Sequence, residues 1–490
     1  MNKILLSTLL TIILCGCMIG PDYKRPAIET PPTWRFEEKE VKQIGNTAWW
    51  EQFGDPVINS LIQTALAENK DIMVASARVE EFLGQYATTR AGLFPQAGAG
   101  ATAGRSRVSD NSATPLTSAT INPADNYSPF INASWEIDLW GKLRRATEAA
   151  RADLLSLEEA RRGVILTLVT SVASAYVNLR NLDMQLDIAK RTAQSRKETY
   201  DLFQLRFQVG VISELELSQV KSEYEQALST IPFLEKAIAQ QENALSILLG
   251  RNPGPISRGK KIDDLVLPAV PAGLPSELLA NRPDIRQAEQ TLVAANARIG
   301  VARSQYFPTI SLTGSYGFAS TDLTTLFQGP SRVWNWAVPV SVPVFTAGAI
   351  GGQVKAAEAR QRQALILYQQ SIQTAFREVD DALIDQRRSR EELEILSRQV
   401  ESLNSYATFA RLRFDNGYTS YIEVLDAERG LFNAELARAQ TKGTLFHALV
   451  SLYKAMGGGW IIEADAKTTP KQNQEQTSSP NTSSGGNAAK

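Results

Sequence analysis

The residue types that most often do chemistry in enzymes are scarce in this chain. Its 490 residues include one histidine, His447, and two cysteines, Cys15 and Cys17. A metal cluster of cysteine and histidine ligands is therefore excluded, and a histidine-based catalytic triad is disfavoured. His447 lies in an apolar helical pattern beside Phe446 and Leu449, which favours a packing role. The sequence predicts no catalytic residue and no metal site.

Charge and motifs narrow the function classes further. The chain has 51 basic and 52 acidic residues, a balance that argues against a nucleic-acid partner. It contains no phosphate-binding glycine loop and no nucleophile motif. We therefore expect a protein that is not an enzyme.

The two cysteines lie at the end of an export signal. Residues 1–16 combine a basic head with a short apolar run, which predicts a secretory signal peptide. The run ends in Leu14-Cys15-Gly16-Cys17, which resembles the lipobox of bacterial lipoproteins. The resemblance implies cleavage before Cys17 and covalent diacylglycerol and palmitate on it, with no other cofactor. Met18 is not the aspartate that usually retains such lipoproteins in the inner membrane. The alternative is a conventional cleavage that leaves a free cysteine.

A short motif occurs twice in the chain. Both copies carry Arg-Phe, then Gly, then Ser-x-x-Glu at the same offsets, in Arg206-Phe207, Gly210, Ser213 and Glu216 and in Arg413-Phe414, Gly417, Ser420 and Glu423. Glycine readily takes the left-handed conformation that ends a helix, and Ser-x-x-Glu is a capping box that starts one. The motifs therefore predict the tips of two helical hairpins, at about residues 207–213 and 414–420.

The rest of the chain is also duplicated. Asn69-Lys70-Asp71-Ile72 matches Arg282-Pro283-Asp284-Ile285, at a slightly wider separation than the two tip motifs, so the first copy holds a few extra residues before its tip. In each copy we expect a helix, two strands and a long helical hairpin, the first helix running from about Val57 to Leu93. The predicted divisions are an extended arm over 17–56, repeats over 57–252 and 276–460, a linker over 253–275 and a disordered tail over 461–490.

Alternation of apolar and polar residues predicts two strands in each repeat. They cover about 95–107 and 127–138 in the first copy and about 309–320 and 333–345 in the second. In one of them Ile131 and Trp135 face one way, opposite Asn132 and Glu136. Ten-residue strands with terminal aromatic residues are typical of membrane barrels, and a soluble sandwich is the alternative.

Four strands cannot close a barrel alone. A bacterial barrel built from one chain has at least about eight strands, and an open sheet edge cannot face lipid. If these strands span a membrane, several copies of the chain must share one barrel. Pro339 and Pro343 lie in the last strand, where proline removes a ladder donor, and the sequence does not explain how they fit.

The helices that follow the strands are unusually long. Leu143 to Arg206 contains no proline, and Gln353 to Arg413 contains neither proline nor glycine. At 1.5 Å per residue the first would extend roughly 95 Å. The returning helices run from Ser213 to Leu249 and from Ser420 to Met456. Their apolar stripes are narrow, as in coiled coils, which predicts two long hairpins in place of a globular core.

Together these features resemble the TolC-type outer-membrane factors, specifically the lipidated, OprM/NodT-like branch that serves resistance-nodulation-division (RND) efflux pumps. The residues that carry the resemblance extend from Cys17 to about Trp460, and include Gly20-Pro21-Asp22-Tyr23, Trp49-Trp50, Asn281-Arg282-Pro283-Asp284, Phe307-Pro308 and Leu425-Asp426-Ala427-Glu428-Arg429. The resemblance implies an α+β membrane protein. In it, three chains form a twelve-stranded β-barrel that a long periplasmic α-helical barrel continues.

The resemblance also implies a function and a site. The protein would lie in the cell outer membrane as the exit duct for drugs or other small toxic compounds passed on by a periplasmic adaptor and an inner-membrane RND transporter. The gate would consist of Asp426 with Ile422 and Glu423, and the tips Gly210, Ser213, Gly417 and Ser420 would dock the adaptor. For Asp426 the alternative is a solvated surface carboxylate, and for the tip residues it is plain helix capping. Phe414 and Thr419 depart from the tyrosine–arginine latch of the best-known family member.

Other functions remain open at this point. A periplasmic adaptor would also be a lipoprotein with a coiled-coil hairpin, although adaptors have one hairpin and soluble β modules. An enzyme tethered by lipid has no support from motifs. Within the efflux interpretation, the alternative is the outer-membrane component of a type I protein secretion or metal efflux system.

Overall fold

The computed structural model describes residues 18–28, 30–35, 48–109, 111, 121–268, 275–457, 460–461 and 465. The predicted signal peptide, Cys17 and most of the predicted tail lie outside this part. The elements, in chain order, are η1 (Trp49–Phe53), α2 (Pro56–Glu68), α3 (Lys70–Ala91), β1 (Gln96–Ser106), β2 (Ala124–Ile137), α4 (Lys142–Gln208), α5 (Glu214–Leu248), η2 (Ile262–Asp264), α6 (Pro275–Asn281), α7 (Pro283–Ser304), β3 (Thr309–Phe318), η3 (Gly329–Ser331), β4 (Arg332–Ala337), β5 (Val340–Ser341), α8 (Ala349–Asp415) and α9 (Tyr421–Ala455).

The chain forms two compact units. The first takes in Ala77–Ala160, Asp284–Thr374 and the described residues up to Thr30, and it contains the sheet. The second takes in Arg161–Pro283 and the described residues of Pro31–Ser76 and Ala375–Lys490, and it contains both hairpin tips.

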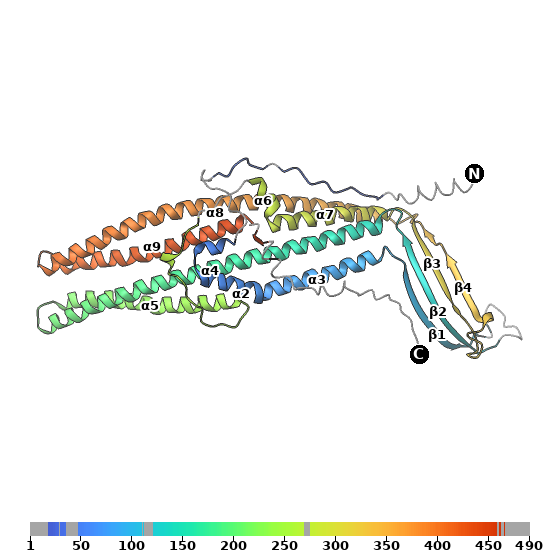
Figure 1. Ribbon diagram of the computed structural model, residues 1–490, viewed down its shortest axis with the longest axis horizontal. Coiled ribbons are helices and arrows are strands. Elements are labelled where there is room, and N and C mark those ends of the chain that lie inside the picture. Colours follow the sequence, from blue (N-terminus) through green and yellow to red (C-terminus); the bar gives the residue numbers. More distant parts are fainter. Residues whose placement is uncertain are drawn as a thin grey trace, which may run out of the picture. The chain divides into compact units, whose positions relative to one another are not determined.

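The element boundaries follow the internal duplication. The helices α4 and α8 both have 67 residues, α5 and α9 both have 35 residues, and α3 and α7 both have 22 residues. The starts of α4 and α8, like those of α5 and α9, have the same separation as the two tip motifs. The starts of α3 and α7 have the wider separation seen between Asn69 and Arg282. Figure 1 shows the resulting pairs, with α5 beside α4 and α9 beside α8. The predicted tandem repeat is confirmed.

The strands form one antiparallel sheet in the order β1-β2-β3-β4, as Figure 1 shows. Directly paired residues share a face, and the pairing aligns the predicted apolar residues on one side, for example Ala99, Ile131, Tyr316 and Trp334. The next row, on the other side, is Gly98, Asn132, Ser315 and Asn335. Trp334 and Trp336 are 66% and 69% exposed. In the part of the chain that the structure describes, no second sheet covers this apolar face, so the sandwich alternative is wrong.

The last strand is shorter than predicted and is interrupted. Instead of running from 333 to 345 it splits into β4 and β5 around Pro339 and ends at Ser341, before Pro343. The register to β3 is the same on both sides of the break. The Ser311 N–H donates to the Pro339 carbonyl at 3.1 Å, and only the return bond from the missing proline N–H is lost. One ladder bond is therefore the cost of Pro339.

The predicted single helix from Val57 to Leu93 is wrong, because it is two helices divided at Asn69. Asn69 has extended backbone, and its Oδ1 accepts from the N–H groups of Asp71 (2.8 Å) and Ile72 (3.2 Å). Its Nδ2 donates to the Leu248 carbonyl at 2.9 Å. A side chain that caps one helix and ties it to another favours the break over continuation.

The arm does not extend to residue 56 as predicted. Trp49, Trp50 and Phe53 are buried on η1, where the Trp49 ring stacks on Tyr453 of α9 at a centroid distance of 4.7 Å. The next carboxylate, Asp55, is fully buried and accepts from the Tyr176 hydroxyl at 2.7 Å. Three bulky aromatic residues within five positions bury more apolar surface than an extended arm could.

These aromatic residues belong to a core that the narrow-stripe prediction missed. Buried α4 side chains occupy more than one stripe, and the Tyr176 hydroxyl reaches Asp55 beside η1. The fully buried α4 residues include Ile165, Val169, Val172, Ala173, Tyr176, Val177 and Leu179. A window of α4 is long and apolar enough to cross a membrane, but 56% of it is buried inside the protein. Its apolar character therefore reflects core packing.

The prediction that a disordered tail starts at residue 461 is wrong. Trp460 and Ile461 are buried, and the Trp460 ring packs edge-on against Trp50 at 5.0 Å. The Asp465 carboxylate then pairs with Arg161 and with Arg162, the latter at 3.1 Å. The polar composition of residues 461–490 does not reveal these contacts, because only the Trp460 ring and the Asp465 carboxylate make them.

Candidate functional site: the hairpin tips

Both hairpin tips have the same backbone. Gly210 and Gly417 have φ of +76° and +75°, the left-handed region that glycine enters without strain. The Gly210 N–H donates to the Phe207 carbonyl and the Val211 N–H to the Arg206 carbonyl, each at 2.9 Å. The second tip repeats both bonds at the same distance, from Gly417 and Tyr418. This is the Schellman motif, and it satisfies carbonyls that a helix end leaves free.

The two predicted capping boxes have different outcomes. At the first tip, the Ser213 N–H donates to Glu216 Oε2 at 2.9 Å and the Glu216 N–H donates to Ser213 Oγ at 3.3 Å. At the second tip, Ser420 has the same extended backbone but its side chain makes no cap bond. The second capping box is therefore wrong. Ser420 is exposed, so water can satisfy the free N–H groups there.

The predicted gate residues lie on the first two turns of α9. Ile422 is 58% exposed, and Asp426, one turn later on the same side, is also exposed. Glu423 is half-buried and lies about 100° further around the helix. The structure thus places Ile422 and Asp426 together on an open face and separates Glu423 from them.

A packed base fixes the orientation of this face. Tyr421, Val424 and Leu425 are buried in one apolar cluster with Phe203 of α4 and Val220 of α5. The Phe203 and Tyr421 ring centroids are 4.3 Å apart. The Phe414 ring also packs here, 5.1 Å from Tyr421. Because so much apolar surface is shared, the exposed face of α9 turns only if its neighbours move.

A buried carboxylate joins three helices below this base. Glu223 of α5 pairs with Arg196 of α4 at 3.1 Å and with Arg429 of α9, whose Nε lies 3.1 Å from Glu223 Oε1. The Arg196 side chain also donates to the Glu223 backbone carbonyl at 2.7 Å. Burial lowers the pKa of Arg196, whereas Glu223 raises the pKa of the more exposed Arg429. We call Arg196, Glu223 and Arg429 the three-helix ion cluster.

The sequence reasoning missed this cluster, although the duplication contains a signal for it. At the matching positions of the second repeat, Leu403 and Gly430 replace Arg196 and Glu223. Leu403 reaches close to Gly430, since a Cβ added to this glycine would lie 3.2 Å from the leucine Cδ2. An apolar contact in one copy therefore takes the place of an ion pair in the other.

Burial shifts the pKa of two other titratable groups on α9. Burial raises the pKa of Glu428 although Arg411, 3.9 Å away, opposes the shift. Burial also lowers the pKa of His447, which is half-buried between buried neighbours Phe446 and Ala448. His447 is therefore held in its neutral form, as expected of a packing residue.

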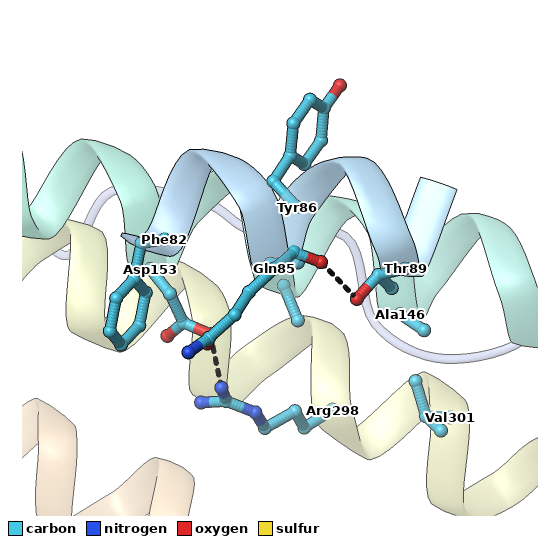
Figure 2. Close-up of a pocket in the computed structure, with 10 residues that line it drawn as sticks. Phe82, Gln85, Tyr86, Thr89, Ala146, Asp153, Arg298 and Val301 are labelled. Carbon is cyan, nitrogen blue, oxygen red and sulfur yellow. Dashed lines mark hydrogen bonds and ion pairs between the residues drawn. The ribbon is translucent and has the colours of Figure 1, made fainter. Parts of the chain in front are cut away.

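The first unit has a surface cavity between α3, α4 and α7. Its volume is about 290 Å³. Figure 2 shows the Asp153 carboxylate paired with Arg298, while Phe82 and Tyr86 project from α3. The cavity residues include no nucleophile beside a general base. Within the described residues, no group of three histidine, cysteine or acidic side chains could hold a metal ion.

The comparisons with known proteins decide the family. The family model described as outer membrane efflux protein matches the chain twice, over residues 61–251 and 274–458. The chain belongs to the outer membrane efflux protein family. The two matches coincide with the two repeats.

Individual relatives agree over nearly the whole chain. This efflux protein is 36% identical to the cation efflux system protein CusC of Escherichia coli over 467 residues, which cover 93% of this chain and 98% of that protein. It is 35% identical to the probable efflux pump outer membrane protein TtgC of Pseudomonas putida, covering 94% and 96%. The crystal structure of the Campylobacter jejuni CmeC outer membrane channel superimposes with a TM-score of 0.88 at 26% identity, covering 93% and 99%.

The predicted resemblance to outer-membrane efflux factors is therefore confirmed. The efflux protein is a channel component of the outer membrane that extends into the periplasm. The adaptor alternative is wrong, because the family and the two hairpins both differ from it. The roles of the individual tip and gate residues stay predictions.

Proposed function

We propose that three copies of this chain form the exit duct of a tripartite efflux pump, through which small toxic compounds leave passively. The observation that supports it best is the sheet, which has one polar face and one apolar face that is exposed over its aromatic residues. Such a sheet is stable in lipid only if its edges are paired. If other copies of the chain close the sheet into a ring, every strand edge is paired and the apolar face can meet lipid.

The strand edges and apolar helix side chains that lack a partner in one copy lie where a neighbouring copy would join it. Among the described strands, β1 pairs only with β2, and β4 pairs only with β3. The helix that leads into β1 exposes Leu83, and the helix that follows β5 exposes Ile366 and Leu367. We propose that β1 and α3 of one copy pair with β4 and α8 of the next.

The partners follow from the same arrangement. A periplasmic adaptor would dock at the tips, where the first tip exposes the apolar side chains Val209, Val211 and Leu215 and the second exposes Tyr418. Gly210, Ser213, Gly417 and Ser420 hold these side chains in place through the tip backbone. An RND-type transporter of the inner membrane would deliver the compounds, and the duct itself would carry out no chemistry.

The first experiment measures the mass of the mature protein in mild detergent, corrected for bound detergent, and then its conductance in planar bilayers. We expect a trimer that conducts. A monomer with intact β structure would overturn the shared barrel, and a trimer without any conductance would overturn the duct.

The gate is tested on the same preparation. In the proposed trimer, three Ile422 side chains narrow the entrance and three Asp426 carboxylates attract cations. We expect Ile422→Gly with Asp426→Ala to raise the conductance, reduce cation preference and admit large antibiotics into cells. Gln219→Ala, at the position of the first repeat that matches Asp426, serves as the control, because Gln219 is not among the exposed tip side chains proposed to dock the adaptor. Unchanged conductance and susceptibility at normal protein levels would contradict the gate assignment.

Metal ions are the second candidate substrate, favoured by the similarity to a cation efflux protein. Type I protein secretion has no such support. A deletion strain that becomes sensitive to salts of metal cations but not to solvents and antibiotics would select the metal interpretation. The reverse pattern would select organic compounds.

The lipid anchor is also proposed. We expect mass spectrometry of the mature chain to find diacylglycerol and palmitate on an N-terminal Cys17, and Cys17→Ala to abolish both. An unmodified cysteine at this position would contradict the anchor.

A further inference from the structure

One row of the sheet breaks the pattern of its polar face. Direct pairing aligns Gly100, Phe130, Gly317 and Val333 across the four strands, on the same face as Asn132 and Ser315. Other described strand residues on this face are small or polar, for example Gly98, Thr102, Ser128, Ser134, Thr313 and Asn335. Among these strand residues, Phe130 is the only aromatic side chain that the polar face presents.

The two glycines of the row make room for this ring. A Cβ added to Gly100 would lie 2.9 Å from Phe130 Cζ, and one added to Gly317 would lie 2.8 Å from Phe130 Cα. Real Cβ contacts are not that close, so a larger residue at position 100 would displace the ring, and one at position 317 would clash with the β2 backbone at Pro129 and Phe130. The ring extends over β1 and keeps 39% of its surface exposed. Small and large side chains thus alternate along the row, and the Phe130 ring stays partly exposed on the polar face of the sheet.

From this row we infer that Phe130, with Val333 two strands away in the same row, forms an apolar constriction inside the barrel. The inference rests on the proposed function, because the polar face lines the lumen only if the apolar face meets lipid. Threefold symmetry then places three Phe130 rings at one height in a wall whose other strand residues, apart from Val333, are small or polar. A hydrated ion that passes these rings loses water and finds no polar group to replace it. An amphiphilic organic compound can instead make apolar contacts with the rings.

The chain suits a thiol test because its only two cysteines are at residues 15 and 17. Phe130→Cys, Val333→Cys and, as the control on the lipid face of the same strand, Ile131→Cys are each introduced into the Ile422→Gly, Asp426→Ala parent. A charged, water-soluble methanethiosulfonate reagent is added during bilayer recording. The same reagent on the parent reports any reaction at residue 17.

We expect the current through the Phe130→Cys channel to fall irreversibly in up to three steps, one for each copy. Val333→Cys should also react, and Ile131→Cys and the parent should not. Separately, Phe130→Ala should raise the potassium chloride conductance and Phe130→Trp should lower it.

The outcomes separate the two claims. A parent that does not conduct overturns the proposed duct. A conducting parent overturns only the constriction if Phe130→Cys and Val333→Cys are unreactive, if Ile131→Cys reacts equally, or if Phe130→Cys is labelled without a change in current. Equal conductance of Phe130→Ala and Phe130→Trp channels would overturn it as well.

Discussion

At the scale of single residues, the three-helix ion cluster shows how a charge can be buried beneath the exposed face that carries Ile422 and Asp426. The Glu223 side chain is 7% exposed, and Arg196 and Arg429 approach it from two other helices. A buried ion pair gives little net stability over an apolar contact, as the Leu403–Gly430 contact of the other repeat illustrates. Removing Glu223 is different, because the Arg196 charge then stays buried without compensation.

We therefore expect Glu223→Gln to destabilise the packing of α4, α5 and α9 by roughly 3–5 kcal/mol. The control is Glu235→Gln, which removes an exposed pair with Lys190 and should change stability by less than about 1 kcal/mol. Thermal unfolding followed by circular dichroism gives the ranking, and hydrogen exchange locates the change. Equal midpoints for the two variants would mean that the cluster is not stabilised by Glu223.

At the scale of elements, the hairpins depend on where each long helix stops. Both 67-residue helices lack an interior proline, so no helix-breaking proline inside them would end them. The two tip glycines end them because their positive φ turns the chain, and the Schellman bonds then satisfy the last carbonyls. The position of the tip is therefore a backbone property of one residue in each repeat.

We expect two glycine substitutions to change stability in opposite directions. Gly417→Ala forces a left-handed alanine and should destabilise the second hairpin by about 1–2 kcal/mol. Gly163→Ala lies inside α4, where no neighbouring atom lies within 4 Å of the added Cβ, and should stabilise the helix by up to about 1 kcal/mol. Thermal midpoints of the purified variants check both. The same sign for both would show that left-handed geometry is not what fixes the tip.

At the scale of the whole molecule, the chain is organised by a sheet that is incomplete alone. Its apolar residues are in register on one face, and its outer strands have unpaired edges in the described part of the chain. A soluble protein would cover such a face, whereas a membrane protein leaves it to lipid. Folding of this sheet should therefore depend strongly on which face carries a charge.

Adjacent residues of β2 test this dependence. Ile131→Arg places a charge on the apolar face and should impair membrane assembly by about 2–4 kcal/mol. Asn132→Arg places the same charge on the polar face and should assemble normally. The yield of heat-resistant trimer in the outer-membrane fraction measures the difference. Similar yields would contradict the assignment of the apolar face to lipid.

The sequence alone determined the features that depend on local periodicity and on comparison of the chain with itself. Alternation identified the strands, the constant separation of matching motifs identified the repeat, and Gly210 and Gly417 identified the tips. Ile422 and Asp426 could be placed on one face because helical spacing fixes that relation. The strands, the tips and the shared face were predicted because neighbouring residues contain all the information needed, and the repeat was predicted because two segments of one chain can be compared directly. The Ser420 capping box failed because a motif does not fix a side-chain rotamer.

Only the tertiary structure decided the features that depend on segments far apart in the chain. The register between β3 and the last strand determines that Pro339 removes one ladder bond, and pairing across four strands places Phe130 between two glycines. The three-helix ion cluster likewise joins residues 27 and 206 positions apart. Periodicity says which face a side chain occupies within its own element. Which residue lies opposite that face is decided only when the elements pack together. Packing selects one strand register or helix contact among many that share the same local pattern.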